Sequence, residues 1–335
     1  MSLRLHGDTL APQDAVDFAV NVWPGQRAVA LEQALEQALA RALGSSRYPD
    51  ESEARAAVAA RHGRNVDEVL LLNGACEAFW LLAHVLRPRR AACLHPSFTE
   101  AEAALRAVNA DVAHVPRRTS DWSLDVDAVP ETARFVVLGN PNNPTGTLDD
   151  PDEIKALVRP ERLVVVDESF MDFTDGAASL AATPLPGLIV IRSLTKLWSL
   201  AGIRAGFLLA SADVVASLTA NRQPWSVNTL ACAALATCAA DTETPARVAA
   251  EVAVERAFLS RGLITLGLQV WPSAANFLLL KTSNAEALRL RLLDAGIAVR
   301  PAASFPGLDA DYLRVAVREH DDNQRLLAAL TKALR

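Results

Sequence analysis

Between residues 188 and 206 the chain reads LIVIRSLTKLWSLAGIRAG. Its first four residues are all apolar, and a short apolar run bounded by polar residues is typical of a fully buried β-strand. Hydroxyl-bearing and basic side chains follow directly. Open α/β sheets bind their ligands beyond the carboxyl ends of their strands. This stretch therefore predicts a buried sheet and also the edge at which the sheet binds a ligand.

Similar apolar runs recur on both sides of this stretch. Amphipathic patterns that predict helices lie between them, for example at 77–86 and 100–108. Buried strands that alternate with helices are typical of a mostly parallel sheet with helices on both faces. The expected fold class is therefore α/β with a doubly wound sheet. The other apolar runs are 69–72, 91–94, 135–138, 163–166 and 207–210.

The pattern changes after about residue 211. An Ala-rich helical region is expected over 214–266, with breaks at Pro224, Pro245 and Gly262. Short strands mixed with helices follow, which indicates a smaller α+β domain. We expect 30–225 to form the large domain, and 1–29 with 226–335 to form the small one. The later elements are expected at 276–280, 285–295, 297–300 and 312–317, followed by a final helix.

Composition restricts the possible functions. The chain has 335 residues, of which 51% are hydrophobic, enough for a large core and more than one domain. A net charge of -6 argues against a nucleic-acid-binding surface. The chain has neither an apolar run long enough to span a membrane nor an N-terminal secretory signal, so a cytoplasmic protein is expected. Its four cysteines lack metal-ligand spacing and are expected to be buried, reduced and free of metal.

A candidate for covalent chemistry is Lys196, five residues after the apolar run 188–191. A lysine at the end of a strand is ordinarily a solvated surface residue. Here Ser193 and Thr195 precede it, and Arg204 follows between two glycines. Ser193 and Arg204 suit a phosphate, with the arginine as a charge-assisted donor. Lys196 is then placed to attack an aldehyde that is held through that phosphate.

A second candidate is Asp167, which directly follows the buried strand 163–166. A carboxylate at such a position is costly unless it has a cationic partner. A protonated pyridine nitrogen is such a partner, and the pair keeps the ring able to accept electrons. The alternative is that Asp167 caps a following helix.

Two turns complete the pattern. Residues 139–146 read GNPNNPTG after an expected strand; such residues make turns, but two Asn-Pro steps also fix the direction of an amide side chain. That amide suits the phenolic oxygen of an aromatic cofactor. Residues 73–77 read NGACE, where a strand ends and a helix begins. The free N–H groups of a helix start can bind an anion, although strand-Gly-helix turns are common without one.

Together these segments resemble the fold-type I pyridoxal-phosphate (PLP) enzymes of the class I/II aminotransferase superfamily, over nearly the whole chain. The resemblance implies a PLP-dependent transferase fold, with a mostly parallel seven-stranded sheet sandwiched by helices. It implies that Lys196 forms the Schiff base, Asp167 pairs with the pyridine nitrogen and Asn143 bonds the phenolic oxygen. The implied phosphate cup consists of backbone groups of Ala75 and Cys76 together with Ser193, Thr195 and Arg204.

The resemblance assigns three further residues. Phe98, in the segment HPSF (95–98), falls where the family stacks an aromatic ring on the cofactor. Tyr48, in RYPD (47–50), matches a tyrosine that reaches the phosphate of the neighbouring subunit. That match implies a homodimer with shared active sites. Arg314 matches the arginine whose planar fork binds the substrate's α-carboxylate.

Two branches of the superfamily are most similar, histidinol-phosphate aminotransferase and the threonine-phosphate decarboxylase of cobalamin biosynthesis. The aminotransferase usually has a tyrosine where this chain has Phe170, in the segment DESF (167–170). Phenylalanine there is similar to the decarboxylase, as are several other segments. These are DFAVN (17–21), PWSVN (224–228), SFPGL (304–308) and RVAVR (314–318).

The resemblance therefore favours decarboxylation of L-threonine O-3-phosphate to aminopropanol phosphate through an external aldimine. The alternative is an aminotransferase of the histidinol-phosphate type, or of broader specificity, that transfers an amino group to 2-oxoglutarate. Both imply a small phosphorylated substrate and a second anion site. Arg300 is the first candidate for that site, and the further substrate-binding candidates are His6, Asn21 and Asn228. His6 can equally belong to a disordered terminus.

Two other classes of protein fit the sequence poorly. A regulator built on this fold carries an additional DNA-binding domain, for which an acidic chain of 335 residues has no room. A dehydrogenase is also excluded, because no G-x-G-x-x-G follows the first expected strand.

Overall fold

The structure is a computed structural model that describes residues 3, 7, 11–12 and 14–335. A seven-stranded sheet has the order β2-β8-β7-β6-β5-β3-β4. Only β8 runs antiparallel to its neighbours, so the expected mostly parallel sheet is confirmed. Its strands are β2 (Val69–Asn73), β3 (Arg90–His95), β4 (Asp111–Pro116), β5 (Phe135–Gly139), β6 (Leu163–Asp167), β7 (Leu188–Ser193) and β8 (Ala205–Leu209).

Six of these strands coincide with the predicted apolar runs, and β4 is the strand that the sequence analysis missed. β4 has the sequence DVAHVP and pairs only with β3, at the edge of the sheet. Its side chains are mostly exposed or half-buried. An edge strand needs no continuous apolar run, so its sequence lacks the signal that identifies the central strands.

Helices cover both faces of the sheet because side chains along each strand alternate between two cores. Val136, Val164 and Val190 face one core, and their neighbours Val137 and Val165 face the other. This is the doubly wound arrangement expected from the sequence. One core includes α3 (Cys76–Leu86), α4 (Glu100–Ala107) and α6 (Ala212–Ala220); the other includes α1 (Val29–Gly44), α2 (Ser52–His62), α5 (Pro151–Ala156) and α7 (Thr229–Ala240).

A four-stranded sheet with the order β12-β13-β10-β9 lies in the C-terminal part. The N-terminal strand β1 (Val16–Asp17) pairs in parallel with β11 (Ile297–Ala298), so residues from both ends of the chain pack together. The helices α9 (Ala285–Asp294) and α10 (His320–Ala333) complete this part. Its four strands are β9 (Gln269–Val270), β10 (Phe277–Lys281), β12 (Arg300–Pro301) and β13 (Tyr312–Ala316).

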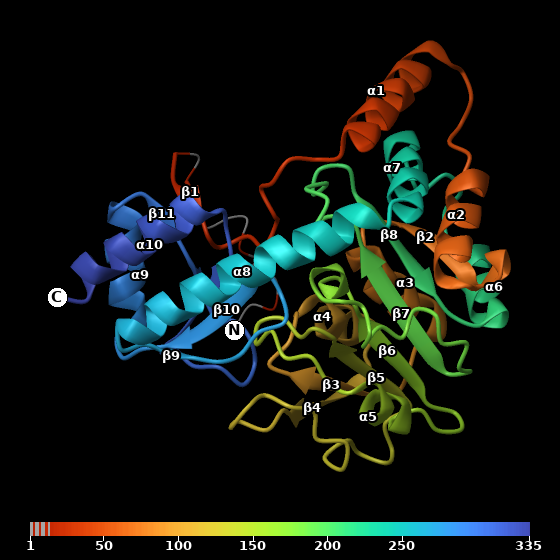
Figure 1. Ribbon diagram of the computed structural model, residues 1–335. Helices are drawn as coiled ribbons and strands as arrows, with labels where there is room; N and C mark the ends of the chain where they lie inside the picture. Colours follow the sequence, from red (N-terminus) through yellow and green to blue (C-terminus); the bar gives the residue numbers. More distant parts are fainter. Residues whose placement is uncertain (1–2, 4–6, 8–10, 13) are drawn as a thin grey trace.

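The long helix α8 (Glu243–Thr265) runs from the large sheet to the smaller one (Figure 1). Two of the predicted breaks in the Ala-rich region are wrong. Pro245 lies in the first turn of α8, where a missing N–H removes no helix hydrogen bond. Gly262 lies inside α8, where a Cβ would come within 2.5 Å of Leu327 Cδ1, so this glycine allows α10 to pack closely. The break at Pro224 is confirmed, because it separates α6 from α7.

Within the part of the chain that the structure describes, no helix combines the length and the apolar character needed to cross a membrane.

Candidate active site

The register of the large sheet brings the predicted strand-end motifs to one edge. Gly139 pairs with Asp167, and Asp167 pairs in turn with Ile191. Ser193, at the end of β7, pairs with Gly206 at the start of the antiparallel strand β8. Segments spread over residues 139–206 therefore meet where a ligand is expected.

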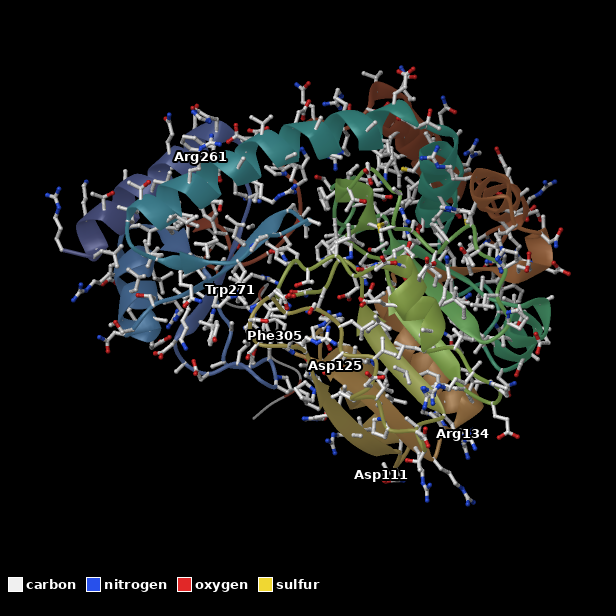
Figure 2. All side chains as sticks on the ribbon, turned by 60° about the horizontal axis from the view of Figure 1, so that its bottom comes forward. Asp111, Asp125, Arg134, Arg261, Trp271 and Phe305 are labelled. Atoms are coloured by element: carbon white, nitrogen blue, oxygen red, sulfur yellow. The ribbon has the colours of Figure 1, made fainter. Side chains whose placement is uncertain are left out.

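A cavity of about 430 Å³ opens at this edge, between the large sheet and the C-terminal part. Phe305 lines it and lies where these two parts face each other (Figure 2). The cavity collects most of the residues that the sequence analysis singled out. These are Asn21, Phe98, Asn143, Asp167, Thr195, Lys196, Arg204, Arg300 and Arg314.

The predicted phosphate cup lies beside the start of α3. Gly74 has φ +81°, and a Cβ there would lie 2.2 Å from Arg204 Nη2. A Cβ on Gly206 would lie 2.7 Å from the backbone nitrogen of Ala75. Only glycines therefore allow the Arg204 guanidinium and β8 to approach the helix start so closely. The Ser193 hydroxyl is held by that of Thr195 at 2.8 Å. Guanidinium, hydroxyls and a helix start suit a phosphate.

Cys76, the first residue of α3, departs from the expectation that the cysteines are buried. It is half-buried, and its thiol lies 3.8 Å from Glu100 Oε2. Burial, with a smaller effect of Glu100, raises the pKa of the Cys76 thiol to about 12. The thiol is therefore uncharged at neutral pH, and only the backbone of Cys76 suits an anion.

Asp167 is held in a defined orientation at the end of β6. Its Oδ1 accepts hydrogen bonds from the backbone nitrogen of Ser169 at 3.0 Å and from the Ser169 hydroxyl at 2.5 Å. Burial raises the pKa of Asp167, while these hydrogen bonds and the charge of Lys196 oppose the rise. Among the described residues, no hydrogen bond reaches Oδ2. That oxygen is thus available to a cationic ligand group, and the carboxylate stabilises a turn rather than capping an α-helix.

Lys196 is half-buried in the cavity and is not a solvated surface residue. Its carbonyl oxygen accepts a hydrogen bond from the backbone nitrogen of Trp23 at 3.0 Å, which ties the N-terminal segment to the lysine. Its Nζ lies 5.9 Å from the centre of the Phe170 ring. Phe170 takes the place of the tyrosine that one branch of the superfamily has here, so no phenolic hydroxyl is present at that position.

The GNPNNPTG turn is fixed by the amide of Asn142. Its Nδ2 donates to the carbonyl of Pro96 at 2.9 Å and to the hydroxyl of Thr145 at 2.8 Å. The following residue, Asn143, extends into the cavity, and its Oδ1 accepts a hydrogen bond from Arg314 Nη1 at 2.6 Å. The other guanidinium nitrogen, Nη2, donates to the carbonyl of Ala19 at 2.6 Å.

Two buried arginines lie side by side in the cavity. Arg300 on β12 pairs with Arg314 on β13, and 3% and 6% of their surfaces are exposed. Burial, followed by the charge of Arg300, lowers the pKa of Arg314 to about 9, so the Arg314 guanidinium remains cationic at neutral pH. Arg300 donates to the Ser304 hydroxyl at 2.7 Å and lies 5.4 Å from the Phe305 ring centre. Two adjacent buried cations suit an anionic ligand.

The amide of Asn21 also faces this cavity. It is 3% exposed, and neither its Nδ2 nor its Oδ1 has a hydrogen-bond partner among the described residues. Buried amide groups are normally hydrogen-bonded, so an unpaired one in a cavity indicates a polar ligand group.

Two of the predicted residues lie away from this cavity, and a third falls outside the described residues. Tyr48 is 69% exposed and stacks on Trp225 with the ring centres 4.1 Å apart, away from the cavity of its own chain. His6 lies outside the described residues. Asn228 is a helix cap: its Oδ1 accepts from the backbone nitrogen of Ala231 at 2.9 Å, and its Nδ2 donates to the carbonyl of Ile203 at 3.0 Å. Asn228 is therefore removed from the substrate candidates.

Two polar residues that line the cavity were not predicted from the sequence. Ser169 holds Asp167, and its signal is the Asp-x-Ser pattern, in which an Asp side chain bonds the backbone two residues on. Thr99 donates a hydrogen bond of 2.5 Å to the carbonyl of Leu3, which brings the N-terminal segment beside the cavity. This second contact joins residues 96 positions apart and has no local sequence signal.

Comparison with known proteins agrees with this geometry. Residues 13–330 match the family model described as aminotransferase class I and II. The chain is 45% identical to a histidinol-phosphate aminotransferase of Mycobacterium tuberculosis over 324 residues, which cover 94% of this chain and 87% of that protein. It is 33% identical to the threonine-phosphate decarboxylase of Salmonella typhimurium over 340 residues, 97% of this chain and 93% of that one.

A solved histidinol-phosphate aminotransferase of Sinorhizobium meliloti, in complex with pyridoxal 5'-phosphate, superposes with a TM-score of 0.85 at 21% identity; the match covers 94% of this chain and 90% of that one. The expected PLP-dependent transferase fold is thereby confirmed. The cavity fits this cofactor, since it offers an amine, a carboxylate and a cationic cup. The cofactor is pyridoxal phosphate. The chain therefore belongs to the aminotransferase class I and II family.

Proposed function

We propose that this protein is an aminotransferase of the histidinol-phosphate type, which exchanges an amino group between a phosphorylated amine and a 2-oxo acid. The observation that carries the proposal is the similarity over nearly the whole chain. Identity is 45% to the M. tuberculosis histidinol-phosphate aminotransferase and 33% to the S. typhimurium threonine-phosphate decarboxylase. This order reverses the preference for a decarboxylase that a few short segments suggest.

The paired arginines support a substrate with separate anionic groups. In the proposed reaction, Arg314 binds the carboxylate of the amino-acid and oxo-acid partners, because its planar fork matches a carboxylate. Arg300 binds the phosphate ester, and its contact with Ser304 fixes its direction. Asn21, which also lines the cavity, supplies further polar contacts.

Other residues of the site are proposed to bind the cofactor and to transfer a proton at the substrate's α-carbon. Pyridoxal phosphate, when bound, supplies an electron sink for the charge that develops at the substrate's α-carbon. Asp167 would keep a proton on the pyridine nitrogen, and Arg204, Ser193 and the start of α3 would hold the phosphate. Lys196 would hold the cofactor covalently, and its amine would move a proton to and from the substrate's α-carbon.

The second candidate is decarboxylation of threonine phosphate, and the observation that favours it is Phe170. With a phenyl ring 5.9 Å from Lys196 Nζ, the cavity lacks a hydroxyl at that position. The two arginines also suit threonine phosphate, which carries a carboxylate and a phosphate on one molecule. Which bond breaks depends on whether the carboxylate or the α-hydrogen is held perpendicular to the cofactor ring.

We further propose a homodimer in the cytoplasm in which each subunit completes the site of the other. The support is the position of Tyr48, which is exposed on the segment between α1 and α2 rather than turned into its own cavity. A residue placed in this way is able to reach a neighbouring subunit.

The test uses the purified enzyme loaded with pyridoxal phosphate. L-Histidinol phosphate with 2-oxoglutarate is expected to yield glutamate, and histidinol without its phosphate is expected to react poorly. L-Threonine O-3-phosphate is supplied separately, and release of carbon dioxide is measured. Rapid carbon dioxide release without glutamate formation from histidinol phosphate would overturn the aminotransferase proposal in favour of the second candidate.

A further inference from the structure

Three potential metal ligands, none of which lines the active-site cavity, meet on the face of the large sheet that α4 covers. His95 ends β3, His114 lies in β4, and Glu102 lies in α4. His114 pairs with Cys93, two residues before His95, so both imidazoles project from the same face of the sheet. Glu102 lies between them. Its Oε2 is 3.0 Å from His95 Nε2, and its Oε1 is 2.7 Å from His114 Nε2.

The inner half of this cluster is buried and incompletely hydrogen-bonded. Only 3% of His95 and 2% of Glu102 are exposed. His95 Nε2 and Glu102 Oε2 are in ion-pair contact at 3.0 Å. In the described part of the chain, neither these two atoms nor His95 Nδ1 has another hydrogen-bond partner. Buried polar atoms without partners are costly, so this arrangement needs a further stabilising group.

We propose that His95, Glu102 and His114 form a binding site for a divalent transition-metal ion such as Zn²⁺, separate from the cofactor. Two imidazole nitrogens and one carboxylate oxygen are a ligand set that this ion prefers. Metal–ligand distances of about 2.0–2.1 Å place neighbouring ligand atoms roughly 3.3 Å apart in a tetrahedral site. The two imidazoles contact different oxygens of Glu102, Oε2 at 3.0 Å and Oε1 at 2.7 Å, and one ligand atom from each of the three residues lies within 4.8 Å of the other two. Small side-chain rotations therefore suffice.

The site reaches solvent at His114. The side chain of His114 is 45% exposed, whereas those of the other two ligands are buried. Figure 2 shows Asp111, the first residue of the same strand, at the outer rim of the molecule. An ion can therefore enter from solvent beside His114, and a water molecule can complete its coordination.

Arg106 is the competing cation. Its Nε donates to Glu102 Oε1 at 2.6 Å, and its side chain is 50% exposed. Because the guanidinium lies at the solvent side, it can turn away when an ion binds. Metal ion and guanidinium therefore compete for the same carboxylate, and removal of Arg106 is expected to favour the metal.

The experiment measures Zn²⁺ binding to the holoenzyme by titration calorimetry, after treatment with EDTA and removal of the chelator. Wild type is expected to bind one ion per chain. His114→Ala, which removes a half-exposed ligand, is expected to weaken binding more than about 100-fold, beyond the loss of an outer-shell partner. Arg106→Gln keeps all three ligands and is expected to tighten binding several-fold. Co²⁺ is expected to give the visible absorption of a tetrahedral site in wild type and none in His114→Ala.

Two controls keep the result interpretable. Both variants are expected to keep the visible absorption of the bound cofactor and the thermal stability of the metal-free protein, which shows that they fold. Any metal bound by the cofactor itself is present equally in all variants. The proposal is overturned if wild type does not bind Zn²⁺ with a Kd below about 0.1 mM, or if His114→Ala binds as tightly as wild type. The cluster is then an ion-pair network only.

Discussion

Arg314 Nη1 donates a hydrogen bond of 2.6 Å to Asn143 Oδ1. A guanidinium can only donate, so the carbonyl oxygen of Asn143 must face Arg314 and the amide nitrogen must point elsewhere. An amide nitrogen is the donor that the phenolic oxygen of the cofactor requires. The residue proposed to bind the substrate carboxylate therefore also orients a residue proposed to bind the cofactor.

Replacing Arg314 by lysine tests this double role. Lysine keeps the positive charge but loses the planar fork that contacts Asn143 and Ala19 together. We expect kcat/KM for 2-oxoglutarate to fall at least about tenfold, as for the loss of one charge-assisted hydrogen bond. We also expect a shifted absorption maximum of the bound cofactor. The matched control is Arg325→Lys, an exposed arginine on α10, which should change neither. An unchanged spectrum in Arg314→Lys would contradict the orienting role.

Asp167 is predicted to reduce the stability of the cofactor-free protein. Burial raises its folded-state pKa above the ordinary value of 3.8. Below pH 3.8 the carboxyl is protonated in both the folded and the unfolded protein. As the pH rises through the folded-state pKa, the charge on the buried carboxylate lowers the free energy of unfolding. Apo Asp167→Asn should therefore have a higher Tm than apo wild type at about pH 8, and the gap should shrink towards pH 4. Pyridoxal phosphate should stabilise wild type more than the variant. Thermal unfolding with and without cofactor measures both effects.

A substitution of Arg300 tests how the enzyme recognises the substrate's phosphate group. In Arg300→Gln the cavity loses one of two adjacent cations, and KM for histidinol phosphate is expected to rise at least about tenfold. The slow reaction with unphosphorylated histidinol should change little. Ser304→Ala, which removes only the hydroxyl that Arg300 contacts, is the milder comparison. An equal loss with both substrates would assign Arg300 a structural role instead.

Local patterns predicted the large sheet and the residues at its edge. Central strands such as β6 are buried on both faces, so their sequences are continuously apolar, and the carboxyl ends of parallel strands converge on one edge. Asp167 and Lys196 could therefore be placed in one site from the sequence. The edge strand β4 could not be found in this way, because one side of it faces solvent.

Contacts between segments that are distant in the sequence could not be predicted from local sequence patterns. Asn143 and Arg314 are 171 positions apart, and no local pattern reports their hydrogen bond. The three proposed metal ligands lie 7 and 12 positions apart on two strands and a helix, which no metal-binding spacing describes. The choice between the two branches depended on short segments around residues such as Phe170. Over nearly the whole chain, identity is 45% to the M. tuberculosis histidinol-phosphate aminotransferase and 33% to the S. typhimurium threonine-phosphate decarboxylase, and short segments do not report this difference.

Lys196→Ala is expected to remove the visible absorption band that the covalently held cofactor gives. The reason is that Lys196 is the only lysine among the described residues that line the cavity. The overall reaction should become undetectable. Binding of the cofactor should weaken but remain measurable, since the phosphate contacts near Arg204 are unaffected. The absorption spectrum and the cofactor content after desalting are the two measurements. A band that survives the substitution would contradict the assignment of Lys196.

The proposed sharing of sites between subunits can be tested by combining two defective chains. Tyr48→Ala is expected to reduce cofactor retention, and Lys196→Ala to be inactive. If Tyr48 serves the neighbouring site, a heterodimer of the two variants contains one complete site, with Lys196 from one chain and Tyr48 from the other. Random assembly at equal expression should restore about a quarter of the wild-type sites. Separately purified variants mixed without subunit exchange provide the control. If co-expression restores no activity, Tyr48 does not act across the dimer.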